Sequence, residues 1–309
     1  MIDGHSHMLM DRDRTGTKRR SVRDLVEIDF AGLFEQMDTV GLEKIVSIVQ
    51  ETTRVGDEWL GTNELVIDLQ NTYPDRFMGV FGAEPLDRSD KLNTRRLDEF
   101  KAAARDHGIR GLFLGPPYSH FYANDERIYP FYEAAVAHDA VVYLHHAGGC
   151  GGGGGAAYRA PMKYARPVLL DDVVIAFPDL NIHVEHMAYP WAEELFALMK
   201  RAPNVYTDVC RLFGRPTILA WYLVMAKEYG VIDRVIWGTD YDVYKRSDFD
   251  FSIYFDRIQR ETSWIRQNLH TILERSGWPN LTQGEVEGIL DGNWKRLHQL
   301  DCRSNSGLT

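Results

Sequence analysis

Apolar, β-branched stretches alternate along this chain with stretches in which apolar residues recur every three or four positions. The first kind predicts buried strands of a parallel sheet, and the second predicts amphipathic helices that cover it. Eight strands are predicted, at residues 2–7, 44–50, 76–82, 108–114, 141–145, 181–186, 204–208 and 234–239. The main predicted helices occupy residues 30–40, 58–72, 94–107, 127–138, 168–177, 191–201 and 216–229.

Eight strand–helix repeats are the number that closes an α/β (β/α)8 TIM barrel, a fold that takes about 250 residues or more. We therefore expect one domain over residues 1–309, because no low-complexity linker divides the chain. An aromatic and charged stretch at 241–277 then leads to two C-terminal closing helices at 282–290 and 292–300. Thr282 and Glu285 predict a capping box at the start of the first.

The composition of the chain limits which binding partners and which cellular location are expected. The net charge of −10 provides no broad positive field, so we expect no nucleic-acid partner. No apolar run has membrane-spanning length and no secretion signal is visible, which predicts a cytoplasmic protein without a membrane partner. The cysteines are odd in number and widely spaced (Cys150, Cys210, Cys302), which argues against a disulfide framework and against a thiolate zinc site.

Candidate chemistry lies where the predicted strands end, because TIM barrels carry their active sites at the carboxyl ends of the strands. His5 and His7 end the first strand, and strand alternation places them on one face. His145 and His146 end the fifth strand, and alternation lets only one of them face the barrel axis. We choose His145.

Two further polar strand ends complete the set. His186 ends the sixth strand and Asp240 follows the eighth. If the sixth strand is regular to its end, His183 and Glu185 point away from His186, and we expect them to face the helices or to support the site from behind. Asp3 either orients an imidazole or makes a hydrogen bond to backbone at the strand end.

Three imidazoles and one carboxylate suit one divalent metal ion, most simply Zn²⁺ and alternatively Mn²⁺, with a position left open for water or substrate. Each member also has a structural interpretation, because the histidines could be satisfied core residues and Asp240 could cap the next helix. Their convergence on one end of a barrel favours a catalytic metal site.

Taken together, the motifs resemble the amidohydrolase superfamily, and more closely its amidohydrolase-related branch, which includes aminocarboxymuconate-semialdehyde decarboxylase and many metal-dependent hydrolases. The similarity covers nearly the whole chain. It rests on Ile-Asp-Gly-His-Ser-His at 2–7, Gly-Ile-Arg-Gly-Leu-Phe-Leu-Gly at 108–115, Val-Tyr-Leu-His at 142–145, Ile-His-Val-Glu-His-Met at 182–187, Pro-Asn-Val-Tyr-Thr-Asp at 203–208 and Trp-Gly-Thr-Asp-Tyr at 237–241.

The resemblance implies that His5, His7, His145 and Asp240 bind the metal. It also implies that His186 lies nearby as a proton carrier or electrophile, so that Asp240 and His186 are the catalytic pair. A bound divalent ion lowers the pKa of its water from about 15.7 toward about 7 and polarises a carbonyl group, which permits attack on an ester, lactone or amide. Asp240 would take the proton, and His186 would stabilise the oxyanion or assist the transfer.

Two enzyme classes remain open, a hydrolase and a non-oxidative decarboxylase of a muconic or aromatic acid. Many decarboxylases of the branch carry glutamate where His5 stands and a Gly-Glu pair soon after the strand-six histidine, whereas here His186 is followed by Met-Ala-Tyr. Both differences favour hydrolysis, although the semialdehyde decarboxylase group also keeps the double histidine. A protein that only binds its ligand is the third alternative.

The loops after the strands are expected to select a small-molecule substrate that carries a carboxylate. Arg54 and Arg211 follow the second and seventh strands, where each could bind that carboxylate, although most surface arginines have no such role. The glycine run 151–155 lies beside His145 and is either a flap that delivers Tyr158 and Arg159 to the site or a tolerated insertion. A homodimer is a further expectation, suggested by the family and by C-terminal aromatic residues.

Overall fold

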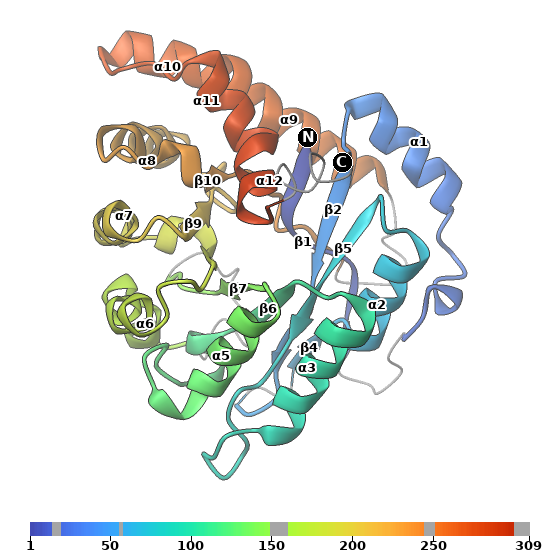
Figure 1. Ribbon diagram of the computed structural model, residues 1–309. Coiled ribbons are helices and arrows are strands. Elements are labelled where there is room, and N and C mark those ends of the chain that lie inside the picture. The colour runs from blue at the N-terminus through green and yellow to red at the C-terminus, as the bar shows by residue number, and fades with distance from the viewer. Residues whose placement is uncertain (14–19, 56–57, 149–159, 244–250, 300–309) are drawn as a thin grey trace, which may run out of the picture.

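The computed structural model describes residues 1–13, 20–55, 58–148, 160–243 and 251–299 (Figure 1). Its framework is a curled parallel sheet with helices outside it, and the predicted α/β TIM-barrel class is confirmed. The eight parallel strands of the barrel are β1 (Ile2–Asp13), β2 (Lys44–Ile48), β5 (Phe77–Gly82), β6 (Gly111–Leu114), β7 (Val141–Leu144), β8 (Ile182–Val184), β9 (Val205–Asp208) and β10 (Val235–Ile236).

Backbone hydrogen bonds bring the two ends of this sheet together. The short strand β11 (Asp242–Val243) pairs in parallel with β1, directly after β10. The amide of His7 donates to the carbonyl of Tyr241 over 2.8 Å, and the amide of Asp240 donates to the carbonyl of His5 over 2.8 Å. The first and eighth barrel strands therefore place His5, His7 and Asp240 side by side.

Helices follow most strands, as predicted. They are α1 (Phe30–Val40), α2 (Asn63–Thr72), α3 (Thr94–His107), α4 (Pro116–Ser119), α5 (Tyr129–Ala137), α6 (Leu170–Ala176), α7 (Ala192–Arg201) and α8 (Pro216–Glu228). The bounds predicted for α1 and α3 are confirmed, because Asp29 and Asn93 cap their first turns and Gly41 and Gly108 end them in the left-handed conformation.

The prediction of a helix over 58–72 is wrong in its first part. Residues Glu58–Leu60 form β4, which pairs antiparallel with β3 (Gln50–Thr52) and with the end of β1. The helix begins only at Asn63, because the side chain of Thr62 accepts a hydrogen bond from the amide of Leu65 and fixes the first turn there. The apolar pattern of 58–62 therefore comes from a strand pairing that is distant in sequence.

The C-terminal segment is helical and closes the fold. It comprises α9 (Phe251–Ser263), a π-helical turn at Trp264–Asn268, α10 (Leu269–Ser276), α11 (Gln283–Glu287), a second π-helical turn at Gly288–Gly292 and α12 (Asn293–Leu297). The predicted capping box is confirmed, because the Thr282 hydroxyl accepts from the Glu285 amide and the Glu285 carboxylate accepts from the Thr282 amide. Among the described helices, none combines the length and the apolar character that a membrane span requires.

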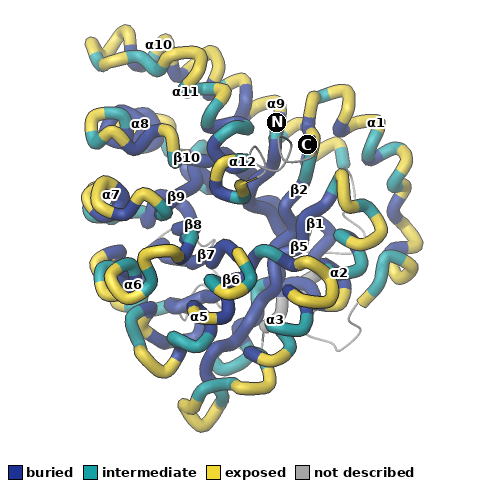
Figure 2. Tube along the Cα trace, in the orientation of Figure 1, coloured by how far each residue is buried: buried dark blue, intermediate teal, exposed yellow. Residues whose placement is uncertain are grey.

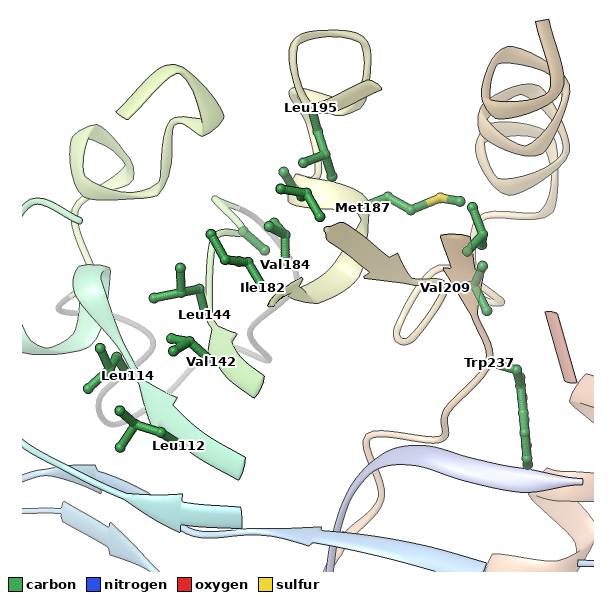
Figure 3. Packing of buried hydrophobic residues seen from close by; sticks show 14 of the residues in the cluster. Leu112, Leu114, Val142, Leu144, Ile182, Val184, Met187, Leu195, Val209 and Trp237 are labelled. Atoms are coloured by element: carbon green, nitrogen blue, oxygen red, sulfur yellow. The ribbon is translucent and has the colours of Figure 1, made fainter. Parts of the chain in front are cut away.

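The strands of the barrel are buried, and most exposed residues lie on the surrounding helices and loops (Figure 2). Strand alternation divides the buried side chains into two clusters. Leu112 and Leu114 on β6, with their counterparts on β7 and β8, pack in the layer between sheet and helices (Figure 3). The intervening residues, such as Phe113 and Tyr143, belong to a smaller inner cluster that also includes Trp294 of α12. The residues that follow in the inner register at the carboxyl ends of the strands are polar, and they form the site.

Candidate metal centre

Every predicted metal-binding or catalytic residue lies in one buried cluster at the carboxyl ends of the strands. These residues are His5 and His7 on β1, His145 after β7, His186 after β8 and Asp240 after β10. None of the five is more than 6% exposed. The structure thus brings together side chains that are up to 235 positions apart along the chain, from His5 to Asp240.

The imidazoles of His5 and His7 direct their Nε2 atoms toward Asp240. The Nδ1 of His7 donates to the carbonyl oxygen of Ile48 over 2.8 Å, because that oxygen can only accept. Its Nε2 lies 3.4 Å from Asp240 Oδ1. The Nδ1 of His5 bonds to the Asp208 carboxylate over 2.9 Å, while its Nε2 lies 3.6 Å from Asp240 Oδ1 and has no hydrogen-bond partner among the described residues.

These separations fit ligands of a common ion. Zinc binds imidazole nitrogen and carboxylate oxygen at about 2.0–2.2 Å, so neighbouring ligand atoms in a tetrahedral site lie about 3.4 Å apart. The observed 3.4 and 3.6 Å between Asp240 Oδ1 and the two Nε2 atoms match that spacing. His5, His7 and Asp240 form one of the side-chain groups close enough to hold a metal ion.

The sixth strand differs from the prediction. It ends at Val184, and a turn over Glu185–Ala188 follows, in which His186 has a left-handed backbone with φ of 59°. His183 and Glu185 therefore face the barrel interior together with His186 and not the helices, because the turn breaks the alternation that would have separated them. His183 bonds to Asp208 over 2.8 Å, and Glu185 lies among His5, His145 and His186.

His145 faces this centre, but both of its ring nitrogens have protein partners. Its Nδ1 bonds to Glu185 Oε2 over 2.8 Å, and its Nε2 bonds to the Tyr118 hydroxyl over 2.9 Å. It groups with Glu185 and His186 as possible ligands. His146 is also buried, and neither of its ring nitrogens has a hydrogen-bond partner among the described residues.

Asp208, at the end of β9, organises the floor of the centre, and the candidate residues above did not include it. Its carboxylate accepts from the rings of His5 and His183 and from the amides of His186 and Cys210. Its position at a strand end, like that of Asp240, is the sequence signal that could have revealed it. Burial and the nearby Asp208 raise the pKa of Cys210 well above its usual value, so this side chain is present as a thiol.

Asp3 does not take the orienting role that was one of its two interpretations. Its carboxylate accepts hydrogen bonds from the amide and hydroxyl of Thr239 and from the hydroxyl of Tyr254. It therefore ties β1 to the end of β10 and to α9. The carboxylate that orients His5 is Asp208.

Backbone geometry at the site is unusual for these residue types. His186, Arg211 and Asp240 all have φ between 47° and 62°. Such left-handed conformations cost non-glycine residues roughly 1–3 kcal/mol each and are frequent at functional sites. Gly238 is required for a different reason, because a Cβ atom there would lie 2.6 Å from the backbone nitrogen of His5. Its hydrogen side chain allows β10 to approach β1 closely enough for Asp240 to reach the histidines.

The electrostatics of the cluster favour a cation. Burial raises the pKa values of its carboxyl groups and is the largest single influence on each. At Glu185, whose pKa falls to about 2, and at Asp208, the combined effect of several histidines, with His5 the strongest, outweighs burial. At Asp240 the combined effect of Arg211, the strongest partner, and the nearby histidines outweighs burial. Burial lowers the pKa of His5, yet Glu185, Asp208 and Asp240 raise it to about 10. With the imidazoles unprotonated, three carboxylates and one guanidinium carry two net negative charges, so one divalent ion that replaced the proton of His5 would neutralise the cluster.

The predicted substrate-binding residues have mixed outcomes. The guanidinium of Arg54 donates to the Ser119 carbonyl over 2.6 Å and pairs with Asp90, so it is engaged within the protein. Arg211 forms an ion pair with Asp240 and is thereby placed at the centre itself. Tyr158, Arg159 and the glycine run 151–155 lie outside the described residues.

Comparisons with known proteins agree with this geometry. A family model described as amidohydrolase matches residues 2–298. No curated protein matches the chain significantly in sequence.

Several solved structures share the fold. An uncharacterized TIM-barrel protein from Bordetella bronchiseptica is 22% identical with a TM-score of 0.62, covering 91% of this chain and 86% of that one. A probable 2-pyrone-4,6-dicarboxylic acid hydrolase from Acinetobacter baumannii is 16% identical with a TM-score of 0.60, covering 96% and 98%. A manganese complex of 5-carboxyvanillate decarboxylase from Novosphingobium aromaticivorans is 16% identical with a TM-score of 0.58, covering 87% and 79%.

Proposed function

Because the chain belongs to the amidohydrolase family, we propose that it is a metal-dependent hydrolase that cleaves an ester, lactone or amide of a small carboxylate-bearing substrate. The observation that carries the proposal is the convergence of His5 Nε2, His7 Nε2 and Asp240 Oδ1 at the separations that one ion requires. A divalent ion held there would supply a water of lowered pKa and would polarise the substrate carbonyl.

The residues around that position suit the removal of a proton from water. Asp240 is ionised, with Oδ2 paired to Arg211 and Oδ1 facing the imidazoles, so it can accept a proton within the site. The Nε2 of His186 lies 3.9 Å from Asp240 Oδ2, which one bridging water would span, so His186 could pass a proton on through that water or stabilise an oxyanion as it forms.

Hydrolysis is favoured over decarboxylation by the same charges. Hydrolysis needs a group that takes a proton from water, whereas decarboxylation needs a group that delivers a proton to a carbanion. Asp240 and Glu185 are ionised, so they can accept a proton but have none to deliver to a carbanion. Decarboxylation is the alternative, since both hydrolase and decarboxylase structures share this fold.

We propose zinc as the ion, with manganese second. Neutral imidazoles and carboxylates suit both, and the manganese complex of the decarboxylase structure supports the second choice.

The test combines elemental analysis of the purified protein with a panel of lactones, esters, amides and aromatic or muconic acids. Product acid and released carbon dioxide are scored separately, before and after the metal is removed with a chelator and restored. Acid without carbon dioxide, lost and regained with the metal, is the expected result. Carbon dioxide release would select the alternative, and turnover that is unaffected by metal removal would overturn both.

A further inference from the structure

Tyr118 reaches the metal centre from a strand end that carries none of the predicted ligands. It lies on α4, directly after β6, and is only 8% exposed. Its hydroxyl lies 2.9 Å from Nε2 of His145, and the two rings pack with their centroids 4.4 Å apart. A hydroxyl group, which can donate a hydrogen bond, therefore lies beside a predicted metal ligand.

The other contact of His145 shows which group donates in this pair. Nδ1 of His145 bonds to Oε2 of Glu185 over 2.8 Å, and a carboxylate oxygen accepts, so the proton of the ring is on Nδ1. Burial lowers the pKa of His145, which keeps the ring neutral. Nε2 then has a lone pair, to which the Tyr118 hydroxyl donates. Glu185 thus orients His145 as the partner of a metal-binding histidine would.

Side chains from two other strand ends hold α4 in this position. The guanidinium of Arg54 donates to the carbonyl oxygens of Ser119 and His120 over 2.6 and 3.3 Å. The Ser119 hydroxyl donates to the carboxyl group of Glu84 over 2.8 Å. Arg54 is therefore a positioning residue for the segment that carries Tyr118, although the sequence analysis expected it to bind substrate directly.

The inference rests on the metal-dependent function proposed above, with the ligand set that the resemblance implies. Nε2 of His145 has a single lone pair, so it cannot bind an ion and accept from Tyr118 at the same time. Neighbouring ligand atoms around such an ion lie roughly 3–3.5 Å apart, so a hydroxyl beside one ligand can reach an oxygen at the next position. We propose that Tyr118 binds the substrate by donating a hydrogen bond to its reacting oxygen.

A hydroxyl donor suits an oxygen on which negative charge develops, such as the carbonyl oxygen of an ester, lactone or amide that water attacks. The rings of Tyr118 and His186 both pack against His145, with centroids 4.4 and 5.0 Å from it. The two residues can therefore serve one substrate group. Tyr118 stabilises the oxyanion, and His186 is left to transfer the proton.

The experiment measures ligand binding to the metal-loaded full chain and does not depend on turnover. The probe is acetohydroxamate, an anion whose oxygens bind Zn²⁺ and also accept hydrogen bonds. Isothermal titration calorimetry measures its dissociation constant, and titration against a competing chelator measures the affinity for Zn²⁺. The variants are Tyr118→Phe and, as a matched control, Tyr132→Phe. Tyr132 is also buried, but it lies in the outer cluster and its hydroxyl donates to the Ala123 carbonyl over 2.8 Å.

We expect Tyr118→Phe to bind acetohydroxamate about 10- to 100-fold more weakly than the wild type, because a hydrogen bond to a charged group is lost. Its affinity for Zn²⁺ should equal or exceed that of the wild type, because no hydroxyl then competes for the lone pair of His145. Tyr132→Phe should match the wild type in both measurements, and circular dichroism spectra should be the same for all three proteins.

Unchanged acetohydroxamate binding in Tyr118→Phe would overturn the inference, as would a Zn²⁺-loaded wild type that does not bind acetohydroxamate. Weaker Zn²⁺ binding in Tyr118→Phe would also overturn it, because Tyr118 would then serve only to hold His145. If instead the wild type binds no ion, the proposed function itself fails. The two failures are distinguishable, because the affinity for Zn²⁺ is measured without acetohydroxamate.

Discussion

The barrel buries carboxyl groups in two regions, and their charges differ. The metal centre contains Glu185, Asp208 and Asp240 at the ends of β8, β9 and β10, all with lowered pKa values. The second region contains Glu51 on β3 and Glu84 just after β5, whose pKa values are raised, that of Glu84 to about 8. Burial raises the pKa in both regions, so it does not explain the difference.

The charged and hydrogen-bonding partners of the carboxyl groups explain the difference in their pKa values. Imidazoles and Arg211 surround the carboxylates of the metal centre. Glu84 receives only hydrogen bonds from the Ser119 hydroxyl and the Arg54 amide, because the Arg54 guanidinium pairs with Asp90 and the nearby Arg96 guanidinium pairs with Glu51. Glu84 is therefore neutral at pH 7 and structural. A buried carboxyl group alone does not indicate a metal site, whereas a carboxyl group kept ionised among several imidazoles does.

Removing an ionised carboxylate from the metal centre should have the largest effect. In Asp240→Asn the shared contact to His5 and His7 loses its charge, and Arg211 loses its partner. We expect metal content to fall to background and kcat/KM to fall by at least about 1,000-fold. Elemental analysis and steady-state kinetics check this. Full metal content with unchanged kinetics would remove Asp240 from the centre.

Substitution of His186 should separate the effect on catalysis from the effect on metal binding in the metal centre. Its Nδ1 has no hydrogen-bond partner in the described structure, and its ring stacks on His5 with centroids 5.2 Å apart. We expect His186→Ala to keep its metal while kcat falls about 100- to 1,000-fold, because a proton carrier is lost. The same two measurements apply. Loss of the ion from this variant would show that His186 is a ligand.

Arg211 is the permanent positive charge of the metal centre, and its role can be resolved by kinetics. Because its guanidinium pairs with Asp240, we expect Arg211→Ala to lower kcat about tenfold by freeing that carboxylate to move. Arg211→Lys should recover part of the rate. A rise in KM at unchanged kcat would instead assign Arg211 to the substrate carboxylate.

The sequence predicted most of the fold and the residues that gather at the site, because strand periodicity and position at strand ends are local signals. His5, His7 and Asp240 are examples, since each lies at or just beyond a regular strand. His183 and Glu185 were misplaced because the prediction extended a regular strand to His186, whereas a left-handed turn brings His186 to the interior that His183 and Glu185 already face, and no periodicity reports such a turn.

Long-range pairing accounts for the other differences. Residues Glu58–Leu60 form a strand because β1 continues past the barrel and offers them a partner. The network around Asp208 joins residues from β1, β8 and β9, and a single strand end does not reveal how many donors will reach it.

The smallest expected effect comes from Glu84 in the second region, and it concerns only the free energy of unfolding. A carboxyl group whose pKa is raised on folding binds more protons in the folded state than in the unfolded state, so its contribution to the free energy of unfolding decreases as pH rises. For Glu84 this loss occurs between its usual pKa of 4.5 and about 8. The side chain in Glu84→Gln cannot ionise, so this variant does not lose that stability as pH rises.

We therefore expect Glu84→Gln to match the wild type in stability near about pH 5 and to be more stable by on the order of a few kcal/mol near about pH 9. Denaturant unfolding at both pH values measures the difference, with Glu35→Gln, an exposed change on α1, as the control. Its difference from the wild type should not depend on pH in this way. If Glu84→Gln loses stability relative to the wild type as pH rises, then Glu84 is ionised in the folded state. The contrast between the two regions would then come from something other than their partners.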